Sequence, residues 1–478
     1  MALPQNKTKI VCTIGPASES PDVMEKMIQA GMNIARLNFS YGDFSTHKKV
    51  IGNLRAASSK TGRRLAIMAD LSGPKMRIGE LDPEPIELVP GDTFTLTTDD
   101  ITGNSTRASI SFAGLPKAVK VGDTLYLNDG YIQMEVIKVH ENDVTCTVKV
   151  GGELRSRKGL NLPGIDLGIS AFTKRDRECL QFALENGVDA VSQSFVENAE
   201  DIHEVRKAAQ ELGYQPFIIA KIERSNALTN IDEILEAADG IMIARGDLGV
   251  EVPIERIAVV QKDLMRRANI RAKPCITATQ MLESMTANKR PTRAEATDVS
   301  NAIINGTDCV MLSGESAMGN YPVESVMMLA KIATAVEPER HQIPVKELFQ
   351  GIDLTDRIKP EHLIAGSVEV SLQYATPAAV FVPTRTGATA RSIGRFRLPV
   401  WIIAVSSQET TCQNLQFSYG VFPVREKDHP ENWKSYVKKW LQHHRIPGDI
   451  VVLTEGPSTK HPDANHRMEI IDLRASEK

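Results

Sequence analysis

The sequence contains few cysteines and no long apolar run. Its 478 residues include 6 Cys, none in a C-x-x-C pair or at a metal-ligand spacing from His. This excludes a disulfide-stapled module and a zinc site of the usual spacing. No apolar run approaches the roughly 20 residues that a membrane-spanning helix needs, and the N-terminal residues carry no leader-like segment. We therefore expect a cytoplasmic protein with reduced, buried cysteines and no membrane partner.

The chain also lacks an excess of charge of one sign. Its 56 Lys and Arg residues against 60 Asp and Glu residues give a formal net charge of -4. This balance argues against nucleic acid as the main partner, so any bound anion must meet locally clustered cations. With 42% hydrophobic and 24% charged residues and no short-period repeat, the composition is that of a globular enzyme. The length corresponds to about three domains.

Short apolar runs alternate with amphipathic stretches from residue 8 onward, which predicts βα units and a parallel sheet. Most runs are continuously apolar, as expected for strands covered on both sides. Eight such strands predict a closed (β/α)8 TIM barrel. The expected strands are 9–14, 33–38, 65–70, 188–195, 216–223, 240–246, 274–279 and 309–314.

Two regions depart from the barrel rhythm. Short alternating segments broken by Gly, Asp and Asn predict an all-β insertion, and a later strand-helix alternation predicts an open α/β domain. We divide the chain into a first part of the barrel at 1–70, the inserted β-barrel domain at 71–170, the second part of the barrel at 171–342, and a C-terminal α/β domain at 343–478.

Polar residues gather at the carboxyl ends of the expected strands, where barrel enzymes place their active sites. A single charge at a strand end is often only solvated, but here nearly every strand carries one. The residues are Arg36 and Asn38, Asp70 followed by Lys75 and Arg77, Lys221 and Glu223, Arg245 to Asp247, Thr279 and Gln280, and Ser313 and Glu315. This convergence predicts a functional site at that end of the barrel.

The residue types at this rim predict phosphate binding beside a magnesium-like ion. Arginine holds phosphoryl oxygens with paired donors, and lysine acts as a point charge. Glu223 and Asp247 supply hard oxygen ligands, and Mg2+ prefers one or two carboxylates completed by water and substrate oxygens. The R-G-D-L-G string at 245–249 allows close backbone approach to an anion at a helix start, although it is also compatible with a purely structural turn.

Several long strings resemble the pyruvate kinase family across residues 8 to 335. They are TKIVCTIGPAS, IARLNFS, KGLNLPG, IIAKIE, DGIMIARGDLGVE, ATQMLESM, RPTRAEATDVSNAI and MLSGESAMGNYP. The resemblance implies transfer of the phosphoryl group of phosphoenolpyruvate to ADP, giving pyruvate and ATP in glycolysis. It also implies Mg2+ or Mn2+ as cofactor, a homotetramer, a lid formed by the inserted domain, and a C-terminal domain for allostery and subunit contacts.

The resemblance implies roles for the rim residues. Lys221 stabilises the phosphoryl group in flight and the enolate left behind, and Arg36 binds the phosphoryl group. Glu223 and Asp247 hold the metal. The Gly246 and Asp247 amides and the Thr279 hydroxyl bind the substrate carboxylate, and Thr279 with a water protonates the enolate. The implied nucleotide contacts are Asn38, Arg77 and Lys158, with Lys158 and Asp129 brought in from the lid or its hinge. The implied monovalent-cation region is Asn38, Ser40, Asp70 and Leu71.

Two positions depart from the family pattern. Many members carry Glu in G-P-E-I-R and need potassium, whereas this chain has Lys75, which we count among the catalytic residues. A fixed ammonium can replace the ion, and Leu71 and Ile78 in place of Thr agree with this. We expect activity without potassium; the alternative is a solvated hinge lysine. Tyr41 replaces a frequent nucleotide-contacting His, which leaves the nucleotide preference open.

The segment VFVPTRTGATARSIGRFR resembles the effector loop of relatives. A sugar-phosphate or nucleotide effector would bind its hydroxyls and amides at Thr384, Arg385, Thr386, Gly387, Ala388 and Thr389. An ordinary βα turn is the alternative. Two other functions remain open from the sequence alone: an aldolase that uses Lys221 as a Schiff base, and a catalytically silent sugar-phosphate sensor on the same fold.

Overall fold

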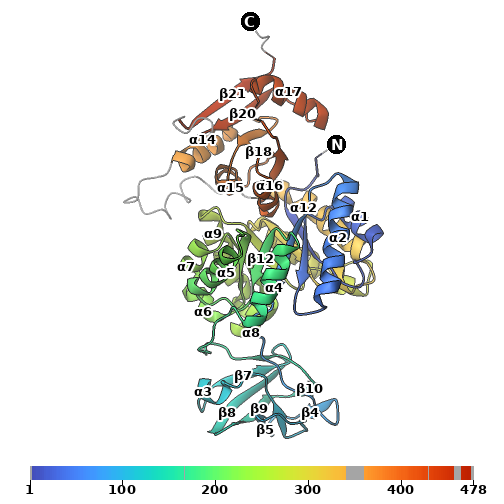
Figure 1. Cartoon of the computed structure of the whole chain (residues 1–478), viewed down its shortest axis with the longest axis vertical. Helices are drawn as coiled ribbons and strands as arrows, with labels where there is room; N and C mark the ends of the chain where they lie inside the picture. The colour runs from blue at the N-terminus through green and yellow to red at the C-terminus, as the bar shows by residue number, and fades with distance from the viewer. Residues whose placement is uncertain (1–2, 166, 341–359, 429, 457–464, 475–478) are drawn as a thin grey trace.

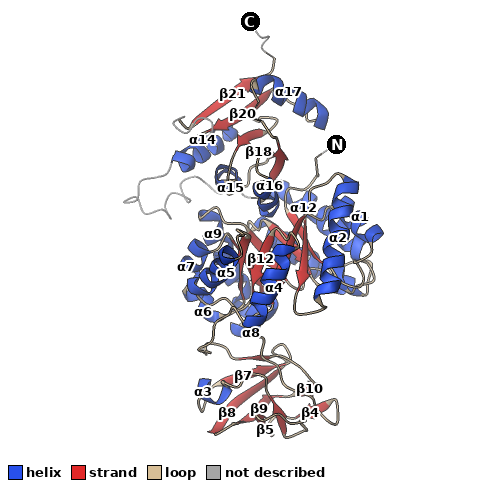
Figure 2. Cartoon of the chain, in the orientation of Figure 1, coloured by secondary structure: helices blue, strands red, loops and turns tan. Residues whose placement is uncertain are grey.

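The computed structural model describes residues 3–165, 167–340, 360–428, 430–456 and 465–474. Eight parallel strands close into a barrel in the order β1-β16-β15-β14-β13-β12-β3-β2 (Figures 1 and 2). The predicted (β/α)8 barrel with an all-β insertion and a C-terminal α/β domain is confirmed. The barrel strands are β1 (Lys9–Thr13), β2 (Ile34–Asn38), β3 (Ala66–Leu71), β12 (Ala190–Gln193), β13 (Phe217–Ile222), β14 (Gly240–Ala244), β15 (Cys275–Ala278) and β16 (Cys309–Leu312).

The barrel strands are continuously apolar because both of their faces are buried. Side chains such as Val11, Met68, Ile219 and Met242 fill the barrel interior. The alternate side chains pack outward against the surrounding helices. These helices are α1 (Pro21–Ala30), α2 (Phe44–Thr61), α4 (Lys174–Glu185), α5 (Ala199–Glu211), α6 (Ser225–Thr229), α7 (Ile231–Ala237), α8 (Arg245–Glu251), α9 (Ile257–Ile270), α10 (Arg293–Ile304), α11 (Gly314–Ala317) and α12 (Pro322–Val336).

Local sequence fixes where several of these helices begin. Thr173, Asn198 and Thr292 each cap a helix in a reciprocal capping box with the acidic residue three positions later. Such caps satisfy backbone N–H groups that lack helical partners. Within the described residues, no helix combines the length and apolarity needed to cross a bilayer. All six cysteines are buried free thiols, as expected.

The insertion between β3 and β12 forms its own apolar core. Strands β11-β7-β8-β9-β5-β6 make one sheet, and β10 pairs with β4. The lid lies beside α8 at the carboxyl ends of the barrel strands (Figure 1). Its elements are β4 (Ile86–Leu88), β5 (Thr93–Thr97), β6 (Arg107–Ser109), α3 (Leu115–Ala118), β7 (Thr124–Leu127), β8 (Ile132–His140), β9 (Asp143–Val150), β10 (Gly152–Leu154) and β11 (Leu160–Asn161).

The C-terminal domain covers the opposite end of the barrel (Figure 1). Phe417 enters the barrel interior and stacks on Phe217, with ring centroids 5.3 Å apart. Arg397 Nη1 donates to Asp308 Oδ1 at 2.5 Å, directly before β16. The expected boundary at 342/343 lies outside the described residues.

The sheet order of the C-terminal domain is β19-β18-β17-β20-β21, with β21 antiparallel to β20. Its elements are α14 (Pro360–Tyr374), β17 (Val380–Pro383), α15 (Ala388–Gly394), β18 (Ile402–Ser406), α16 (Glu409–Asn414), β19 (Val421–Arg425), α17 (Trp433–His444), β20 (Ile450–Glu455) and β21 (Arg467–Asp472). Single 3-10 turns are η1 (Ile254–Arg256), η2 (Glu283–Thr286), η3 (Glu337–Glu339) and η4 (Leu415–Phe417).

Candidate active site

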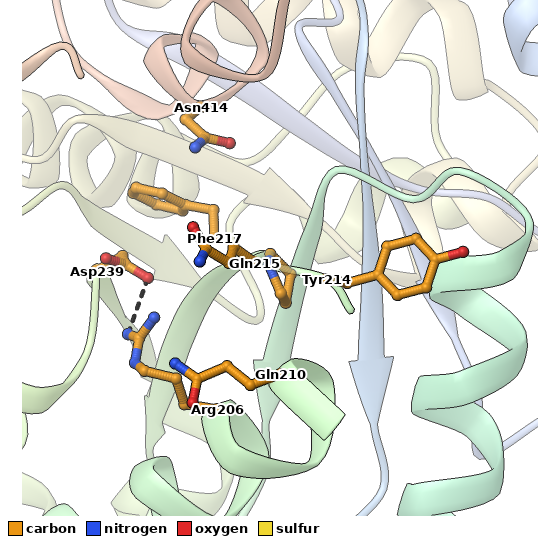
Figure 3. A pocket seen from close by; sticks show the side chains of 8 residues that line it. Arg206, Gln210, Tyr214, Gln215, Phe217, Asp239 and Asn414 are labelled. Carbon is orange, nitrogen blue, oxygen red and sulfur yellow. Dashed lines mark hydrogen bonds and ion pairs between the residues drawn. The ribbon is translucent and has the colours of Figure 1, made fainter. Parts of the chain in front are cut away.

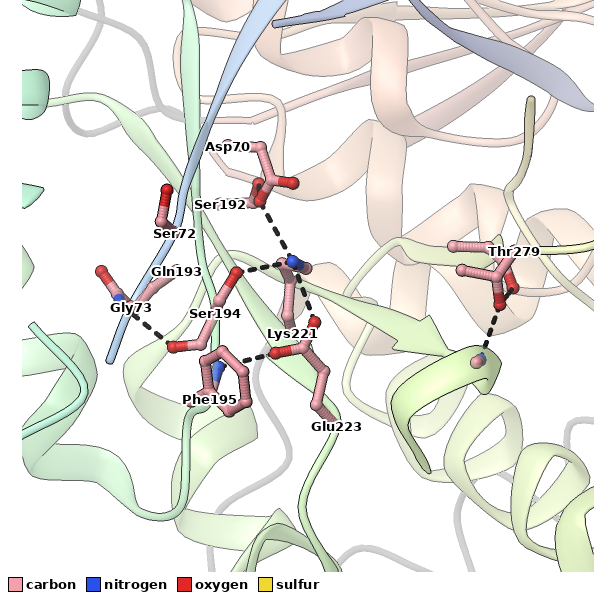
Figure 4. A network of polar contacts seen from close by, with 12 residues as sticks. Asp70, Ser72, Gly73, Ser192, Gln193, Ser194, Phe195, Lys221, Glu223 and Thr279 are labelled. Atoms are coloured by element: carbon pink, nitrogen blue, oxygen red, sulfur yellow. Dashed lines mark hydrogen bonds and ion pairs between the residues drawn. The ribbon is translucent and has the colours of Figure 1, made fainter. Parts of the chain in front are cut away.

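Lys221 lies at the centre of a polar cluster at the carboxyl end of β13. Its Nζ donates to Ser194 Oγ at 2.5 Å and lies 2.9 Å from Glu223 Oε1 and 3.4 Å from Asp70 Oδ1. Figure 4 shows these oxygens converging on the ammonium from neighbouring strand ends. The residue is only 8% exposed. Burial alone would lower the pKa of Lys221, but the charges of Asp70 and Glu223 raise it above the ordinary value, so the ammonium stays charged.

Asp70 joins Lys221 to Arg36. Arg36 Nε donates to Asp70 Oδ2 at 2.9 Å, Nη2 contacts the same oxygen, and Nη1 donates to Thr13 Oγ1 at 2.8 Å. The Ser192 hydroxyl donates to Asp70 Oδ1 at 2.7 Å. Burial favours a raised pKa for Asp70, but the two cations hold the pKa below the usual range. Asp70 is therefore the shared counter-ion of both cations.

Glu223 and Asp247 are the two carboxylates expected to hold a divalent ion. Glu223 is buried, and its Oε2 accepts the Phe195 amide at 2.7 Å. Asp247 lies half-buried in the first turn of α8. Burial and then the Glu223 charge raise the pKa of Asp247 to about 6, while Lys75 and Lys221 oppose this rise. Two acidic groups that repel each other at this mouth fit a divalent cation, which would relieve the repulsion.

Among the described residues, no three His, Cys, Asp or Glu side chains gather as a metal cage. Glu223 and Asp247 would therefore supply two protein ligands at most. This number fits Mg2+, which keeps several positions for water and substrate oxygens.

Thr279 and Gly246 meet on the other side of the mouth. The Gly246 amide donates to Thr279 Oγ1 at 2.8 Å, and this hydroxyl donates to Ala278 O at 2.7 Å. Thr279 has a φ of 67°, which is costly for a β-branched residue, on the order of 1–3 kcal/mol. The predicted carboxylate-binding amide and hydroxyl are thus adjacent, in a turn whose strained backbone is of the kind that clusters at functional sites.

The expected nucleotide contacts lie at the junction of barrel and lid. Asn38 Oδ1 accepts the Ser40 amide at 3.0 Å. Arg77 forms an isolated bridge with Gly159, and its Nη1 donates to Arg157 O at 3.0 Å. The Ile78 amide donates to Lys158 O at 3.0 Å. Arg77 and Lys158 therefore lie on paired segments where the chain enters and leaves the lid.

The remaining predicted residues occupy different environments. Ser40 Oγ lies 2.8 Å from Ser72 Oγ, and Leu71 is fully buried. Lys75 is exposed, yet its charge reaches Asp247. Tyr41 is 67% exposed. No described contact joins Tyr41 or Lys158 to the Lys221 cluster.

Sequence reasoning assigned no role to Ser194 or Ser192, which bind Lys221 and Asp70. The S-Q-S-F string at the end of the expected strand 188–195 was the available signal. Arg245 was counted at the rim, but its Nη2 donates to Thr279 O at 2.7 Å and its Nη1 to Asp298 Oδ1 at 2.7 Å. It therefore supports the Thr279 turn rather than facing the Lys221 cluster.

A cavity of about 300 Å³ lies at the amino ends of β13 and β14, whereas Lys221 lies near the carboxyl end of β13. Figure 3 shows the residues that line the cavity. Arg206 and Asp239 pair there at 3.0 Å, and Asn414 reaches the cavity from the C-terminal domain. Its position at the opposite barrel end separates it from the Lys221 cluster.

The expected effector loop follows β17 as a tight turn. Thr384 Oγ1 accepts the Gly387 amide at 2.9 Å, and Thr386 Oγ1 accepts the Ala388 amide at 3.4 Å. Arg391 Nη2 donates to Thr386 O at 3.1 Å. The loop's own hydroxyls therefore already satisfy two amides that a phosphate would use.

The chain is a (β/α)8 barrel protein whose buried cations and paired carboxylates suit a phosphorylated substrate beside a metal ion. Comparisons with known proteins narrow this class. The family model for the pyruvate kinase barrel domain matches residues 5–326, and that for the pyruvate kinase alpha/beta domain matches residues 362–471. The chain belongs to the pyruvate kinase family, whose reaction is phosphoryl transfer from phosphoenolpyruvate to ADP.

Individual relatives agree with this family. A pyruvate kinase of Thermococcus litoralis is 50% identical over 424 residues, covering 88% of this chain and 89% of the relative. One of Bacillus licheniformis is 40% identical over 457 residues, covering 94% and 78%. The crystal structure of a pyruvate kinase from Cryptosporidium parvum superimposes with a TM-score of 0.91 at 34% identity, covering 98% of this chain and 96% of that one.

Proposed function

We propose that Lys221 is the principal catalytic residue of phosphoryl transfer from phosphoenolpyruvate to ADP. Its ammonium is buried, charged and fixed by oxygens of Ser194, Glu223 and Asp70. A unit charge pair at about 4 Å with an effective dielectric constant of about 20 is worth roughly 4 kcal/mol. That energy corresponds to about a thousandfold in rate if it acts only on the transition state. The position of this one ammonium carries the proposal.

The substrate would bind across the barrel mouth. Arg36 is held by Asp70 and Thr13, so its guanidinium is oriented to receive the phosphoryl oxygens with little loss of side-chain entropy. The amides of Gly246 and Asp247 and the hydroxyl of Thr279 would bind the carboxylate. The 2.8 Å distance between the Gly246 amide and the Thr279 hydroxyl supports this, because two adjacent donors could exchange their present bonds, to Thr279 Oγ1 and Ala278 O, for bonds to one anion. Thr279 and a water would then protonate the enolate.

Glu223 and Asp247 would hold Mg2+ or Mn2+. When bound, the ion supplies positive charge beside the substrate carboxylate, enolate oxygen and phosphoryl oxygens. Asn38, Arg77 and Lys158 would contact the nucleotide. The hinge location of Arg77 and Lys158 supports an arrangement in which lid closure brings them to ADP and keeps water from the phosphoryl group.

Lys75 would replace a monovalent cation. Its ammonium influences the pKa of Asp247 and so lies within electrostatic reach of the site. The neighbouring Leu71 and Ile78 are buried apolar residues that offer no ligand oxygen from their side chains. Asn38, Ser40 and Asp70 complete the region where relatives would bind potassium.

The quaternary and regulatory assignments rest on the family resemblance. We propose a cytoplasmic homotetramer with an effector site at residues 384–389. A thermal-shift screen with fructose bisphosphate, other sugar phosphates and AMP tests the effector site, since a ligand of the folded state raises the melting temperature. Light scattering of the purified protein tests the tetramer.

The decisive experiment on the catalytic site is a lactate dehydrogenase-coupled assay of the Lys221→Met variant. We expect kcat to fall by at least a thousandfold while the far-UV spectrum at the assay temperature stays close to the parent. The melting temperature should fall, because Glu223 and Asp70 lose a buried counter-ion. Lys207→Met, which removes an exposed lysine on α5, is the control and should retain full activity. A Lys221→Met protein that turns over as fast as its parent overturns the proposal.

A further inference from the structure

The segment that returns the chain from the lid to the barrel, residues 162–165, is bound to two consecutive barrel residues. Arg224 Nη2 donates to Ile165 O at 2.8 Å and approaches Leu162 O at 3.5 Å. Ser225 Oγ accepts the Gly164 amide at 3.1 Å. We call residues 162–165 the return segment. These contacts use backbone groups of the return segment, so they fix its path irrespective of its side chains.

Both barrel residues lead to a single buried carboxylate, Glu251. The Ser225 amide and hydroxyl donate to Glu251 Oε2 at 3.2 and 3.1 Å. Arg224 Nε lies 3.8 Å from the same oxygen and 3.2 Å from Glu197 Oε1. Arg224 is 2% exposed and Glu251 is 7% exposed. Removing one partner of a buried ion pair strongly destabilises the folded protein, because the other charge is left without compensation. We therefore expect Arg224 and Glu251 to hold each other in place.

Glu251 is the last residue of α8, the helix that begins with the proposed substrate and metal residues. The helix has seven residues and is therefore only about 10 Å long. Val250, one residue earlier, also contacts the lid: a Cβ placed on Gly130 would lie 3.1 Å from Val250 Cγ2. In Figure 1, α8 lies between the barrel and the lid. One short helix thus touches the lid at a turn and, through Arg224 and Ser225, at the return segment.

We propose that Glu251 is a positioning residue that sets the lid position relative to the substrate site by holding Arg224 and Ser225 against the return segment. The inference rests on the proposed roles of Gly246 and Asp247 at the start of α8. A shift of this helix on substrate binding moves Glu251, and Ser225, through its hydrogen bonds, and Arg224, through its ion pair, transmit that shift to residues 162–165. The position of Lys158 and the lid over ADP then depends on a residue that touches neither substrate.

The kinetic test uses Glu251→Gln, which keeps the size and an acceptor for Ser225 but removes the charge facing Arg224. We expect kcat to fall about tenfold and the KM for ADP to rise severalfold. The variant should remain folded at the assay temperature but melt below the parent, because Arg224 loses a buried counter-charge. Glu251→Asp keeps the charge and should recover part of kcat. The matched control is Asp239→Asn, because Asp239 also joins an arginine, Arg206, to a backbone amide, that of Ile218, but at the other barrel end.

The second readout is lid position. All six native cysteines are buried, so dyes can be directed to Lys117→Cys on α3 of the lid and Lys207→Cys on α5 of the barrel. In the parent, phosphoenolpyruvate with Mg2+ should change energy transfer between the dyes. Glu251→Gln should alter the transfer without ligand and lose at least half of the ligand-induced change. If Glu251 only stabilises the fold, Glu251→Gln will lower the melting temperature but leave the energy transfer unchanged both with and without ligand.

Kinetics and transfer within twofold of the parent overturn the inference. If Glu251→Gln does not fold, Ser225→Ala decides it: kcat should fall about threefold with the same change in transfer, and parental behaviour overturns the proposal. The energy transfer measured without ligand depends only on the contacts of Glu251 with Arg224 and Ser225. It therefore still decides the role of Glu251 if Lys221→Met shows that the proposed substrate site is wrong.

Discussion

Arg245 holds Thr279 from behind: its Nη2 donates to Thr279 O at 2.7 Å, and its Nε donates to Ala278 O at 3.1 Å. The two acceptors are the consecutive carbonyl groups of Ala278 and Thr279, and Thr279 has a positive φ. The guanidinium is in turn fixed by Asp298. The strained turn that presents the Thr279 hydroxyl is thus maintained by a side chain on a different βα unit.

The Arg245→Met variant should therefore bind phosphoenolpyruvate poorly. Loss of two charge-assisted hydrogen bonds lets the Thr279 backbone relax, at a cost of about 1.5–3 kcal/mol for each bond to a charged group. We expect the KM for phosphoenolpyruvate to rise at least tenfold, with a smaller rise for ADP. Steady-state kinetics at varied substrate measures both. Arg267→Met, which removes exposed ion pairs with Asp263 and Asp232, is the control and should leave both values unchanged.

Lys75 should make the enzyme independent of potassium. The parent is expected to keep its activity when tetramethylammonium chloride replaces potassium and sodium salts at equal ionic strength. Lys75→Glu, which reverses the charge, should need added potassium and lose most of its activity without it. Lys117→Glu makes the same charge reversal on the lid surface and serves as the control. Loss of most parental activity without potassium, with recovery on its addition, contradicts the prediction.

Lys9 should make stability depend on pH. Its Nζ donates to Val421 O at 2.7 Å, and burial lowers the pKa of Lys9 to about 8, although Cys309, Glu337 and Asp308 oppose this. Between about pH 8 and the ordinary value of 10.5, the folded state binds fewer protons at Lys9 than the unfolded state, so this residue's contribution to stability rises with pH. The full shift is worth about 3 kcal/mol.

The measurement for Lys9 is urea unfolding from pH 7 to pH 10, compared with Lys9→Met. The free energy of unfolding of the parent, relative to the variant, should increase across this range. Lys60→Met, at an exposed lysine paired with Glu25, corrects for general effects of losing a lysine. A constant difference between parent and Lys9→Met at all pH values would refute the assigned shift.

The fold was predictable because barrel strands are buried on both faces and so appear as continuous apolar runs. Every expected barrel strand overlaps an observed one, and the polar residues after them fall at one end. The Lys221 and Glu223 pair could also be placed, since both lie at the end of one strand. The residues that hold the site segments in place, Arg245 and Arg224, could not be predicted in the same way. Arg245 reaches Ala278 across 33 positions, and Arg224 reaches Leu162 across 62.

Such contacts depend on which side chains the closed barrel brings together, and no local period encodes them. The same limit applies to Ser194, whose hydroxyl becomes a lysine partner only because β12 and β13 are neighbours. The effector site expected in the loop after β17 stays a prediction, and two of the amides in this loop are bound to Thr384 and Thr386. The sequence identified a loop with the right residue types and could not reveal that these groups bind each other.

The aromatic ring of Phe417 fills the end of the barrel interior that faces the C-terminal domain, where it stacks on Phe217. A chain that ended after α12 would leave Phe217 facing water and Asp308 without its arginine. We therefore expect the barrel without the C-terminal domain to be less stable than the full chain, because it would lose this apolar contact and leave a buried carboxylate without its cation.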